Sequence, residues 1–252
     1  MNKIDKDIQE KIILLTGATS GIGIKITEDL LKKGYRVIAT GRKIEKLGLL
    51  KEKYNEEHLK IKLLDFSKSS SVEDFDISFG KINGFINAAG ISPLLPAMFT
   101  NYEILLNSMQ VNFLGPVTLI NKLLKKRRFS RGSSIILLTS IAGSNVSNIG
   151  LSNYSASKAA LIGYIKSVAL EIAPHIRINS IAPGMVDTGT GMFADTIEKM
   201  TKDEIKKDLS MYPLGRFGTP EDVSNMVDFL LSSKSSWITG QNLVIDGGRT
   251  LR

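Results

Sequence analysis

The chain has no cysteine and only two histidines, His58 and His175, among its 252 residues. Without cysteine it can form neither a disulfide framework nor a thiolate metal site, and two histidines far apart in the sequence do not make a ligand cluster. We therefore expect a function that uses no metal ion.

Long apolar runs are also missing, since none approaches the roughly 18 residues that a membrane-spanning helix requires. The first residues, 1–11, are mostly charged or polar and do not resemble a secretion signal. No Pro-rich or Gly/Ser-rich linker divides the chain, and 42% of its residues are hydrophobic, which suffices for one large core. We expect one soluble, cytoplasmic domain, residues 1–252, with no membrane partner.

A general separation of basic from acidic residues along the chain is likewise absent, although the net charge is +8 and the isoelectric point is about 9.5. Lysines are spread along the whole chain and interleaved with acids. Proteins that bind nucleic acid usually gather their basic residues on one face. We therefore expect no nucleic acid partner, and attraction of anionic cofactors or substrates instead.

The most informative pair of residues is Tyr154 and Lys158, at the start of a long apolar-periodic segment. On a helix, residues four apart share a face. Tyrosine titrates near ~10, so acid/base work at pH 7 requires a pKa lower by roughly three units, or ~4 kcal/mol. A lysine at about 4 Å supplies ~4 kcal/mol only where the effective dielectric constant is about 20. A chance pair on a solvated helix is the alternative, so the pair must be judged by the residues around it.

The segment from Lys11 to Lys33 reads as a buried strand, a glycine-rich turn and a helix. Gly17 would let the chain turn, Gly21 would let a pyrophosphate approach the backbone, and Gly23 would let the helix pack closely on the strand. The spacing Gly-x3-Gly-x-Gly differs from the dinucleotide fingerprint Gly-x-Gly-x-x-Gly. A turn that binds no ligand remains the alternative.

Apolar runs and helical periods alternate along the rest of the chain, which predicts a doubly wound parallel sheet with a three-layer α/β/α architecture in a single domain. Strands are expected at 11–16, 35–40, 61–64, 85–86, 134–139, 177–182 and 242–245. Helices are expected at 24–33, at 100–128 with a kink after Asn112, from Tyr154, at 196–209 and from Thr219, and the stretch 67–73 is too short and polar for a full helix. Residues 185–214 are expected to form a lid over the carboxyl edge of the sheet.

The end of the second expected strand bears on cofactor choice. NAD-preferring sites place Asp or Glu there, whereas this chain has Gly41, Arg42 and Lys43. Arg42 could hold the 2′-phosphate of NADP(H) bidentately, with Lys43 and Ser20 as helpers. A solvated arginine that opens a helix is the alternative.

Taken together, these motifs resemble the short-chain dehydrogenase/reductase family over nearly the whole chain. The resemblance lies in Thr16-Gly17-x3-Gly21-Ile22-Gly23, Asn87-Ala88-Ala89-Gly90, Asn112, Ser140, Tyr154-x3-Lys158, and Pro183-Gly184 with Thr188, in the order of that family. It implies a Rossmann-type fold that binds a nicotinamide dinucleotide. The segment from Asp65 to Asn87 is shorter than usual, which puts the form of its helix in doubt.

The resemblance also implies a role for each catalytic residue. Tyr154 would protonate the substrate oxygen while Ser140 hydrogen-bonds it, and Lys158 would lower the pKa of Tyr154 and hold the nicotinamide ribose. Asn112 would hold a water for proton resupply. Contacts with the cofactor are expected from Gly17, Ser20, Gly21, Ile22, Gly23, Arg42, Asp65, Phe66, Asn87, Ala88, Gly90, Tyr154, Lys158, Pro183, Gly184 and Thr188.

The function expected from these residues is NADPH-dependent reduction of a ketone to a secondary alcohol. Within the family the chain looks most like the β-ketoacyl-acyl-carrier-protein reductases, so acyl carrier protein is a candidate partner. Dehydrogenation of a sugar or another small hydroxyl compound with NAD(P) and a non-catalytic dinucleotide-binding module are the alternatives.

Two further expectations concern protein partners. The segments 102–124 and 156–172 are apolar around more than half their circumference, which predicts a two-fold interface, and the resemblance adds a second two-fold near 243–245 and hence a homotetramer. The densest basic cluster could meet an acidic carrier only at the mouth of a neighbouring subunit, because the following strand separates it from its own site. A helix C-terminus that favours cations is the alternative. The cluster comprises Lys125, Lys126, Arg127, Arg128 and Arg131.

Overall fold

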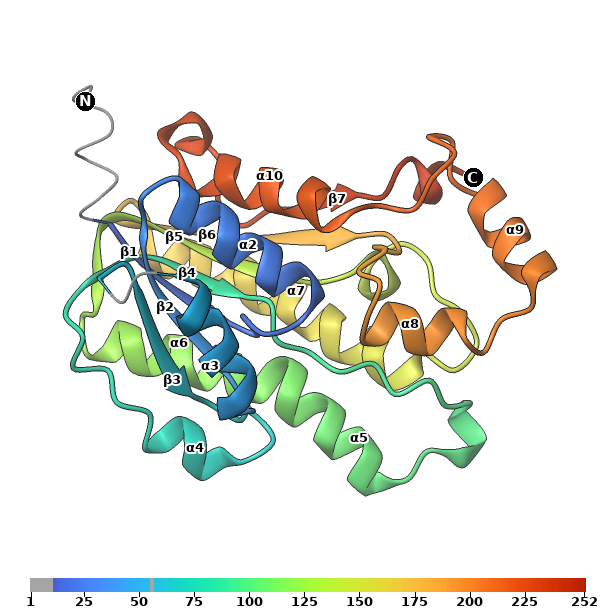
Figure 1. Cartoon of the computed structure of the whole chain (residues 1–252), viewed down its shortest axis with the longest axis horizontal. Coiled ribbons are helices and arrows are strands. Elements are labelled where there is room, and N and C mark those ends of the chain that lie inside the picture. The colour runs from blue at the N-terminus through green and yellow to red at the C-terminus, as the bar shows by residue number, and fades with distance from the viewer. Residues whose placement is uncertain (1–10, 55–56) are drawn as a thin grey trace.

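The computed structural model describes residues 11–54 and 57–252, and its centre is one parallel sheet in the order β3-β2-β1-β4-β5-β6-β7 (Figure 1). The strands are β1 (Ile12–Thr16), β2 (Arg36–Gly41), β3 (Leu59–Leu63), β4 (Ile82–Asn87), β5 (Phe129–Leu138), β6 (Ile176–Pro183) and β7 (Asn242–Ile245). The expected doubly wound Rossmann-type sheet is therefore confirmed.

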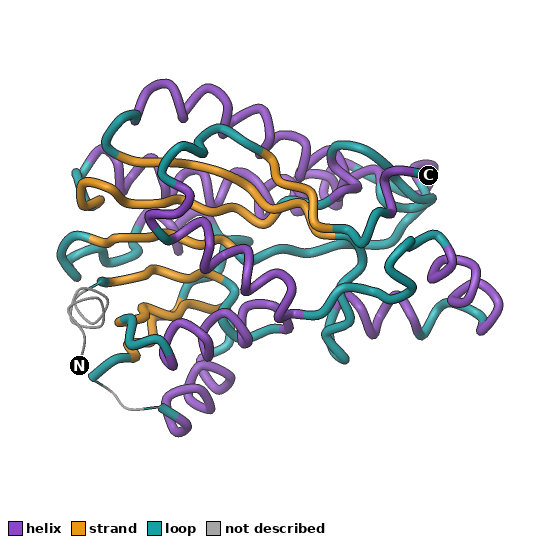
Figure 2. The backbone as a smooth tube through the Cα atoms, turned by 90° about the horizontal axis from the view of Figure 1, so that it is seen from above, coloured by secondary structure: helices purple, strands orange, loops and turns teal. Residues whose placement is uncertain are grey.

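Helices cover both faces of the sheet, because successive strand residues send apolar side chains to opposite sides. In β1, Leu14 joins one core cluster while Ile13 and Leu15 join the other. The Ile13 side is covered by α2 (Gly21–Lys32), α3 (Ile44–Lys53) and α10 (Pro220–Leu231). The Leu14 side is covered by α4 (Ser69–Glu73), α6 (Gly115–Lys125) and α7 (Ser152–Ile172). Figure 2 shows the strands lying between these helices.

The kink expected after Asn112 is confirmed as a π-helical turn. Helix α5 (Tyr102–Met109) runs into this turn, η2 (Gln110–Leu114), and then into α6. Pro116 in the first turn of α6 has no N–H for the helical ladder. Gly115 lies so close to the Phe66 ring that an added Cβ would be 2.7 Å from it. The widened turn buries Asn112 completely.

The single helix expected at 196–209 is wrong, because the segment contains two helices, α8 (Met192–Ile197) and α9 (Lys202–Ser210). Thr201 starts the second helix through a capping box with Glu204, which satisfies backbone N–H groups at the new helix start. Helix α3 was not expected as a defined element, and α4 spans only 5 residues. None of these differences alters the sheet.

The strand order reverses at β1, which pairs with β2 on one side and β4 on the other. In open parallel sheets, the carboxyl ends of strands at such a switch point form the ligand crevice. Within the described residues, no helix is both long and apolar enough to cross a membrane.

Candidate active site

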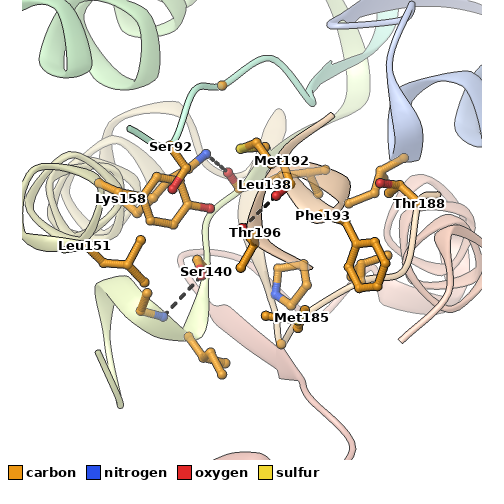
Figure 3. Close-up of a pocket in the computed structure, with 18 of the residues that line it drawn as sticks. Ser92, Leu138, Ser140, Leu151, Lys158, Met185, Thr188, Met192, Phe193 and Thr196 are labelled. Carbon is orange, nitrogen blue, oxygen red and sulfur yellow. Dashed lines mark hydrogen bonds between the residues drawn. The ribbon is translucent and has the colours of Figure 1, made fainter. Parts of the chain in front are cut away.

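A cavity of about 290 Å³ opens at the carboxyl edge of the sheet. Its walls come from the turn after β1, the ends of β4, β5 and β6, the start of α7, the lid segment and the C-terminal turn (Figure 3). Of the expected site residues, those that line it are Ser20, Gly21, Ile22, Ala88, Gly90, Ser140, Tyr154, Lys158, Pro183, Gly184 and Thr188. The fold thus brings most of the sequence motifs to one place.

The turn after β1 is shaped for close backbone approach. A Cβ on Gly23 would lie 2.0 Å from the Gly17 carbonyl oxygen, and one on Gly17 would lie 2.5 Å from the Ala89 nitrogen. Ser20 at the N-cap of α2 makes no side-chain capping bond. The Gly23 N–H donates to the Ser20 carbonyl at 2.7 Å, whereas no described residue accepts from the Gly21 and Ile22 N–H groups, which are therefore available to an anion. This cradle fits the pyrophosphate of a dinucleotide.

The Tyr154 and Ser140 hydroxyls lie together in the cavity, at the start of α7 and the end of β5. The Ser140 hydroxyl accepts a hydrogen bond from the Ala142 N–H at 3.2 Å, which fixes the turn η3 (Ile141–Gly143). Burial raises the pKa of Tyr154 above its usual value, and its hydrogen bond with Ser140 acts in the opposite direction. Both hydroxyls can contact one substrate oxygen.

The lysine of the pair is buried, with 4% of its surface exposed. Its ammonium donates to the Leu138 carbonyl oxygen at 2.7 Å and lies 5.6 Å from the centre of the Tyr154 ring. Burial lowers the pKa of Lys158 to about 8. Burial is the main cause of the pKa shift of both groups, and the lowering of the Tyr154 pKa by Lys158 stays a prediction.

Asn112 is fixed between two elements. Its Oδ1 accepts from the Ile91 N–H at 2.8 Å, and its Nδ2 donates to the Ile91 carbonyl and the Ser157 hydroxyl, both at 2.9 Å. A Cβ on Gly90 would lie 3.3 Å from both Asn112 Oδ1 and Lys158 Nζ. Asn112 therefore joins the chain after β4 to α7 beside the lysine.

Six expected cofactor contacts lie outside the cavity wall, namely Gly17, Gly23, Arg42, Asp65, Phe66 and Asn87. Asn87 is fully buried and its Oδ1 accepts from the Thr16 hydroxyl at 2.6 Å, which joins β4 to β1. Asp65 accepts from the N–H and hydroxyl of Ser67. The Phe66 side chain packs in the core, so only its backbone is available to a cofactor.

Arg42 lies where the sequence predicts it, directly after β2. Its side chain is exposed, as are those of Lys43 and Ser20. Within the described part of the chain, no hydrogen bond or ion pair engages the Arg42 guanidinium. The side chain is therefore free to meet a cofactor phosphate.

The sequence analysis named none of the residues on the remaining wall of the cavity. Met192, Phe193, Thr196, Asp208 and Tyr212 line it from within the expected lid, 185–214, and Arg249 lines it from the C-terminal turn. Tyr212 is buried and its hydroxyl accepts from the Met185 N–H at 3.0 Å. No local pattern marks these residues. Among the described residues, no group of three or more His, Asp or Glu side chains is placed to hold a metal ion.

The chain is similar in sequence to known reductases over nearly its whole length. The model of a protein family described as enoyl-(acyl carrier protein) reductase matches residues 17–250. The chain is 34% identical to 3-oxoacyl-(acyl-carrier-protein) reductase FabG of Aquifex aeolicus, over 96% of this chain and 98% of that protein. It is 35% identical to carbonyl reductase family member 4 of Xenopus laevis, also over 96% and 98%.

Solved structures similar to this chain include a dehydrogenase and a ketoreductase. A 4-hydroxyisoleucine dehydrogenase complexed with NADH matches with a TM-score of 0.86 and 29% identity, over 96% of this chain and 100% of that one. A variant of actinorhodin polyketide ketoreductase with NADPH matches with a TM-score of 0.87 and 26% identity, over 97% and 99%. The similar structures therefore include complexes with each of the two nicotinamide cofactors.

Proposed function

Because the chain belongs to the short-chain dehydrogenase/reductase family of NAD(P)-dependent oxidoreductases, we propose that it reduces a ketone to a secondary alcohol with NADPH. The observation that carries this proposal is the meeting of the Tyr154 and Ser140 hydroxyls in one cavity, beside the buried ammonium of Lys158. Two hydroxyls can serve one carbonyl oxygen, one by giving its proton and one by a hydrogen bond.

When bound, the nicotinamide would supply the hydride that adds to the carbonyl carbon. The Tyr154 hydroxyl would give its proton to the carbonyl oxygen, and Ser140 would hold that oxygen in place. Because burial raises the pKa of Tyr154, the hydroxyl keeps its proton at neutral pH, which is the form that reduction needs. Lys158 would hold the nicotinamide ribose, and Asn112 would connect the lysine to solvent through a water.

The cofactor would lie along the edge from Arg42 to Pro183. Arg42 would bind the 2′-phosphate of NADPH, with Lys43 and Ser20 beside it, because a guanidinium matches phosphate oxygens bidentately. Asp65 would border the adenine, and Pro183, Gly184 and Thr188 would border the nicotinamide. Thr188 already contacts the glycine turn, since a Cβ on Gly21 would lie 2.7 Å from its methyl group.

The substrate we propose is a 3-oxoacyl group on acyl carrier protein, because similar proteins include 3-oxoacyl-(acyl-carrier-protein) reductases. The basic cluster from Lys125 to Arg131 lies around the amino end of β5. At ~3.3 Å per residue, β5 separates it from Ser140 by about 30 Å. The cluster could therefore meet a carrier only at a neighbouring subunit's cavity. Dehydrogenation of a small hydroxyl compound is the second candidate, favoured by the similarity to 4-hydroxyisoleucine dehydrogenase.

The test compares kcat/KM for acetoacetyl-carrier protein, acetoacetyl-CoA and small ketones, with NADPH absorbance as the readout at two salt concentrations. We expect the carrier to be preferred and to lose its advantage as salt rises, because exposed charges are screened. An enoyl thioester is the control for C=C reduction. A lack of carrier preference would favour the small-substrate candidate, and no reduction of any ketone with either cofactor would contradict the proposed function.

We further propose that the active form is a homotetramer in the cytoplasm. Helix α5 leaves Tyr102 72% and Leu106 44% exposed, and near β7 Trp237 is 98% exposed. Large apolar side chains on two separate surfaces suit two different two-fold contacts. Light scattering should give four chains per particle, and a monomer at micromolar concentration would contradict this.

A further inference from the structure

The cavity has one cation besides Lys158. Among its described lining residues only Lys158, Asp208 and Arg249 carry charge. Lys158 already donates to the Leu138 carbonyl oxygen at the reacting end. Arg249 is thus the cation in the cavity wall that is left for a substrate group.

The Arg249 guanidinium is desolvated but poorly paired. Its side chain is 15% exposed, and its Nη2 lies 3.9 Å from Asp208 Oδ1, which is beyond hydrogen-bonding distance. In residues 11–54 and 57–252, no carbonyl or carboxylate accepts a hydrogen bond from this guanidinium. A mostly buried guanidinium that lacks partners is costly, so an acceptor that enters the cavity would be bound well.

The backbone holds Arg249 in place. The Asp246 carboxylate accepts the N–H groups of Gly248 at 2.9 Å and Thr250 at 2.7 Å, on either side of Arg249, and the Asp246 carbonyl accepts the Arg249 N–H at 3.1 Å. A Cβ on Gly184 would lie 3.2 Å from the Asp246 Cα. The turn that carries Arg249 is therefore fixed directly against the expected nicotinamide wall.

We propose that Arg249 binds a carboxylate carried by small ketone substrates, so that among small ketones the cavity selects oxo acids over neutral ones. This inference rests on the proposed ketone reduction and concerns its small substrates, since a carrier-bound 3-oxoacyl thioester has no free carboxylate for Arg249 to bind. The carbonyl would lie against Tyr154 and Ser140, and the carboxylate would replace the weak Asp208 contact with bidentate hydrogen bonds from the guanidinium.

Asp208 would act as the competitor that the substrate displaces. Its side chain is 17% exposed. Burial raises the pKa of Asp208, with Arg249 acting in the opposite direction. The carboxyl group is therefore a weakly held anion, and replacing it with an amide should strengthen the binding of an oxo acid.

The experiment measures kcat/KM for 3-oxobutanoate and 4-oxopentanoate against their methyl esters. The wild type should prefer at least one acid over its ester by tenfold or more, and Arg249→Gln should reduce that ratio by about tenfold or more. Asp208→Asn should raise the ratio. The control is Arg252→Gln, because Arg252 Nη1 donates to the Ser210 carbonyl at 3.1 Å and ties the same C-terminal turn to α9.

Equal loss of the acid-to-ester ratio in Arg249→Gln and Arg252→Gln would show that Arg249 only fastens the lid, and would overturn the proposal. A wild type that prefers the esters, or an unchanged ratio in Arg249→Gln, would also overturn it while leaving ketone reduction intact. Failure to reduce every ketone would contradict the proposed function instead. Binding of 4-oxopentanoate with NADP⁺, measured by a thermal unfolding shift that Arg249→Gln abolishes, tests the subsite without turnover.

Discussion

Lys158 and Arg42 are both cations at the carboxyl edge of one sheet, but their surroundings are opposite. Lys158 is 4% exposed and donates to the Leu138 carbonyl oxygen. Arg42 follows β2 on the surface and has no partner among the described residues. The fold holds the group that would act on the reaction in place before any ligand arrives, whereas the group that would recognise the cofactor phosphate is exposed and has no partner among the described residues.

The difference has an energetic consequence. A buried ammonium stays charged only at a cost, which is why the pKa of Lys158 falls to about 8. An exposed guanidinium incurs no such cost, and its contribution depends on the ligand. Substitutions at the buried end of the site, around Lys158, should therefore alter both the stability of the protein and its turnover of every substrate. Substitutions at the exposed end, around Arg42, should alter only the preference between NADPH and NADH.

The largest effect is expected from Tyr154→Phe, which keeps the ring but removes the transferable proton. We expect kcat to fall by about 10² to 10⁴ for every ketone, because that is the range of a positioned acid. Cofactor binding, followed by NADPH fluorescence, should persist. Tyr164→Phe on the same helix is the matched control, since the Tyr164 hydroxyl donates to Asn121 instead, at 2.7 Å. A Tyr154→Phe protein that reduces ketones at nearly the original rate would contradict the assignment.

The next effect concerns stability at Lys158. Lowering the lysine pKa from 10.5 to about 8 costs the folded state about 3 kcal/mol at pH 7, since one unit is about 1.4 kcal/mol. Loss of the hydrogen bond to Leu138 offsets about 1 kcal/mol of this. Lys158→Met should therefore be more stable than the wild type by about 2 kcal/mol at pH 7 while losing activity. Urea unfolding of both proteins measures the difference.

The pH dependence of the free energy of unfolding tests whether the buried charge of Lys158 causes this difference in stability. Because the folded pKa lies below the unfolded one, the unfolded state binds more protons between pH 8 and 10.5, and the wild type gains stability as pH rises through that window. The advantage of Lys158→Met should shrink accordingly. Lys166→Met changes an exposed lysine of α7 and should show no such trend. A constant difference from pH 7 to 10 would rule out burial of charge as the cause.

Much of the fold was predictable, because buried parallel strands appear in sequence as apolar runs. The expected strand at Asn242–Ile245 has the same bounds in the structure, and β1 differs by one residue. The position of the proposed catalytic residues was also predictable from the order of the strands. Ser140 follows a strand end and Tyr154 begins a helix, so the parallel sheet brings both to the same edge.

The rest depends on contacts that local patterns do not contain. Asp208 and Arg249 meet because the C-terminal turn folds back onto α9, and nothing near either residue indicates the other. The direction of the pKa shift of Tyr154 required knowledge of its burial, which raises the pKa although the hydrogen bond with Ser140 acts in the opposite direction. The break between α8 and α9 did carry a signal, the Thr201-x-x-Glu204 capping pattern, which could have located it.

The smallest effect is expected at the exposed end, from Arg42→Ala. Loss of one charge-assisted, bidentate contact with the 2′-phosphate costs about 1.5–3 kcal/mol, so the ratio of kcat/KM for NADPH to that for NADH should fall by about tenfold or more. The cost should appear chiefly in KM for NADPH, because the phosphate is remote from the reacting atoms and contributes binding energy equally before and during the reaction.

Arg36→Ala is the matched control, since Arg36 is also exposed but begins β2, at the end of the strand away from the cavity. Equal kcat/KM values for the two cofactors in the wild type, or a preference for NADH that Arg42→Ala does not change, would contradict the assignment of Arg42. A loss of kcat with both cofactors would instead show that the exposed end is coupled to the buried one.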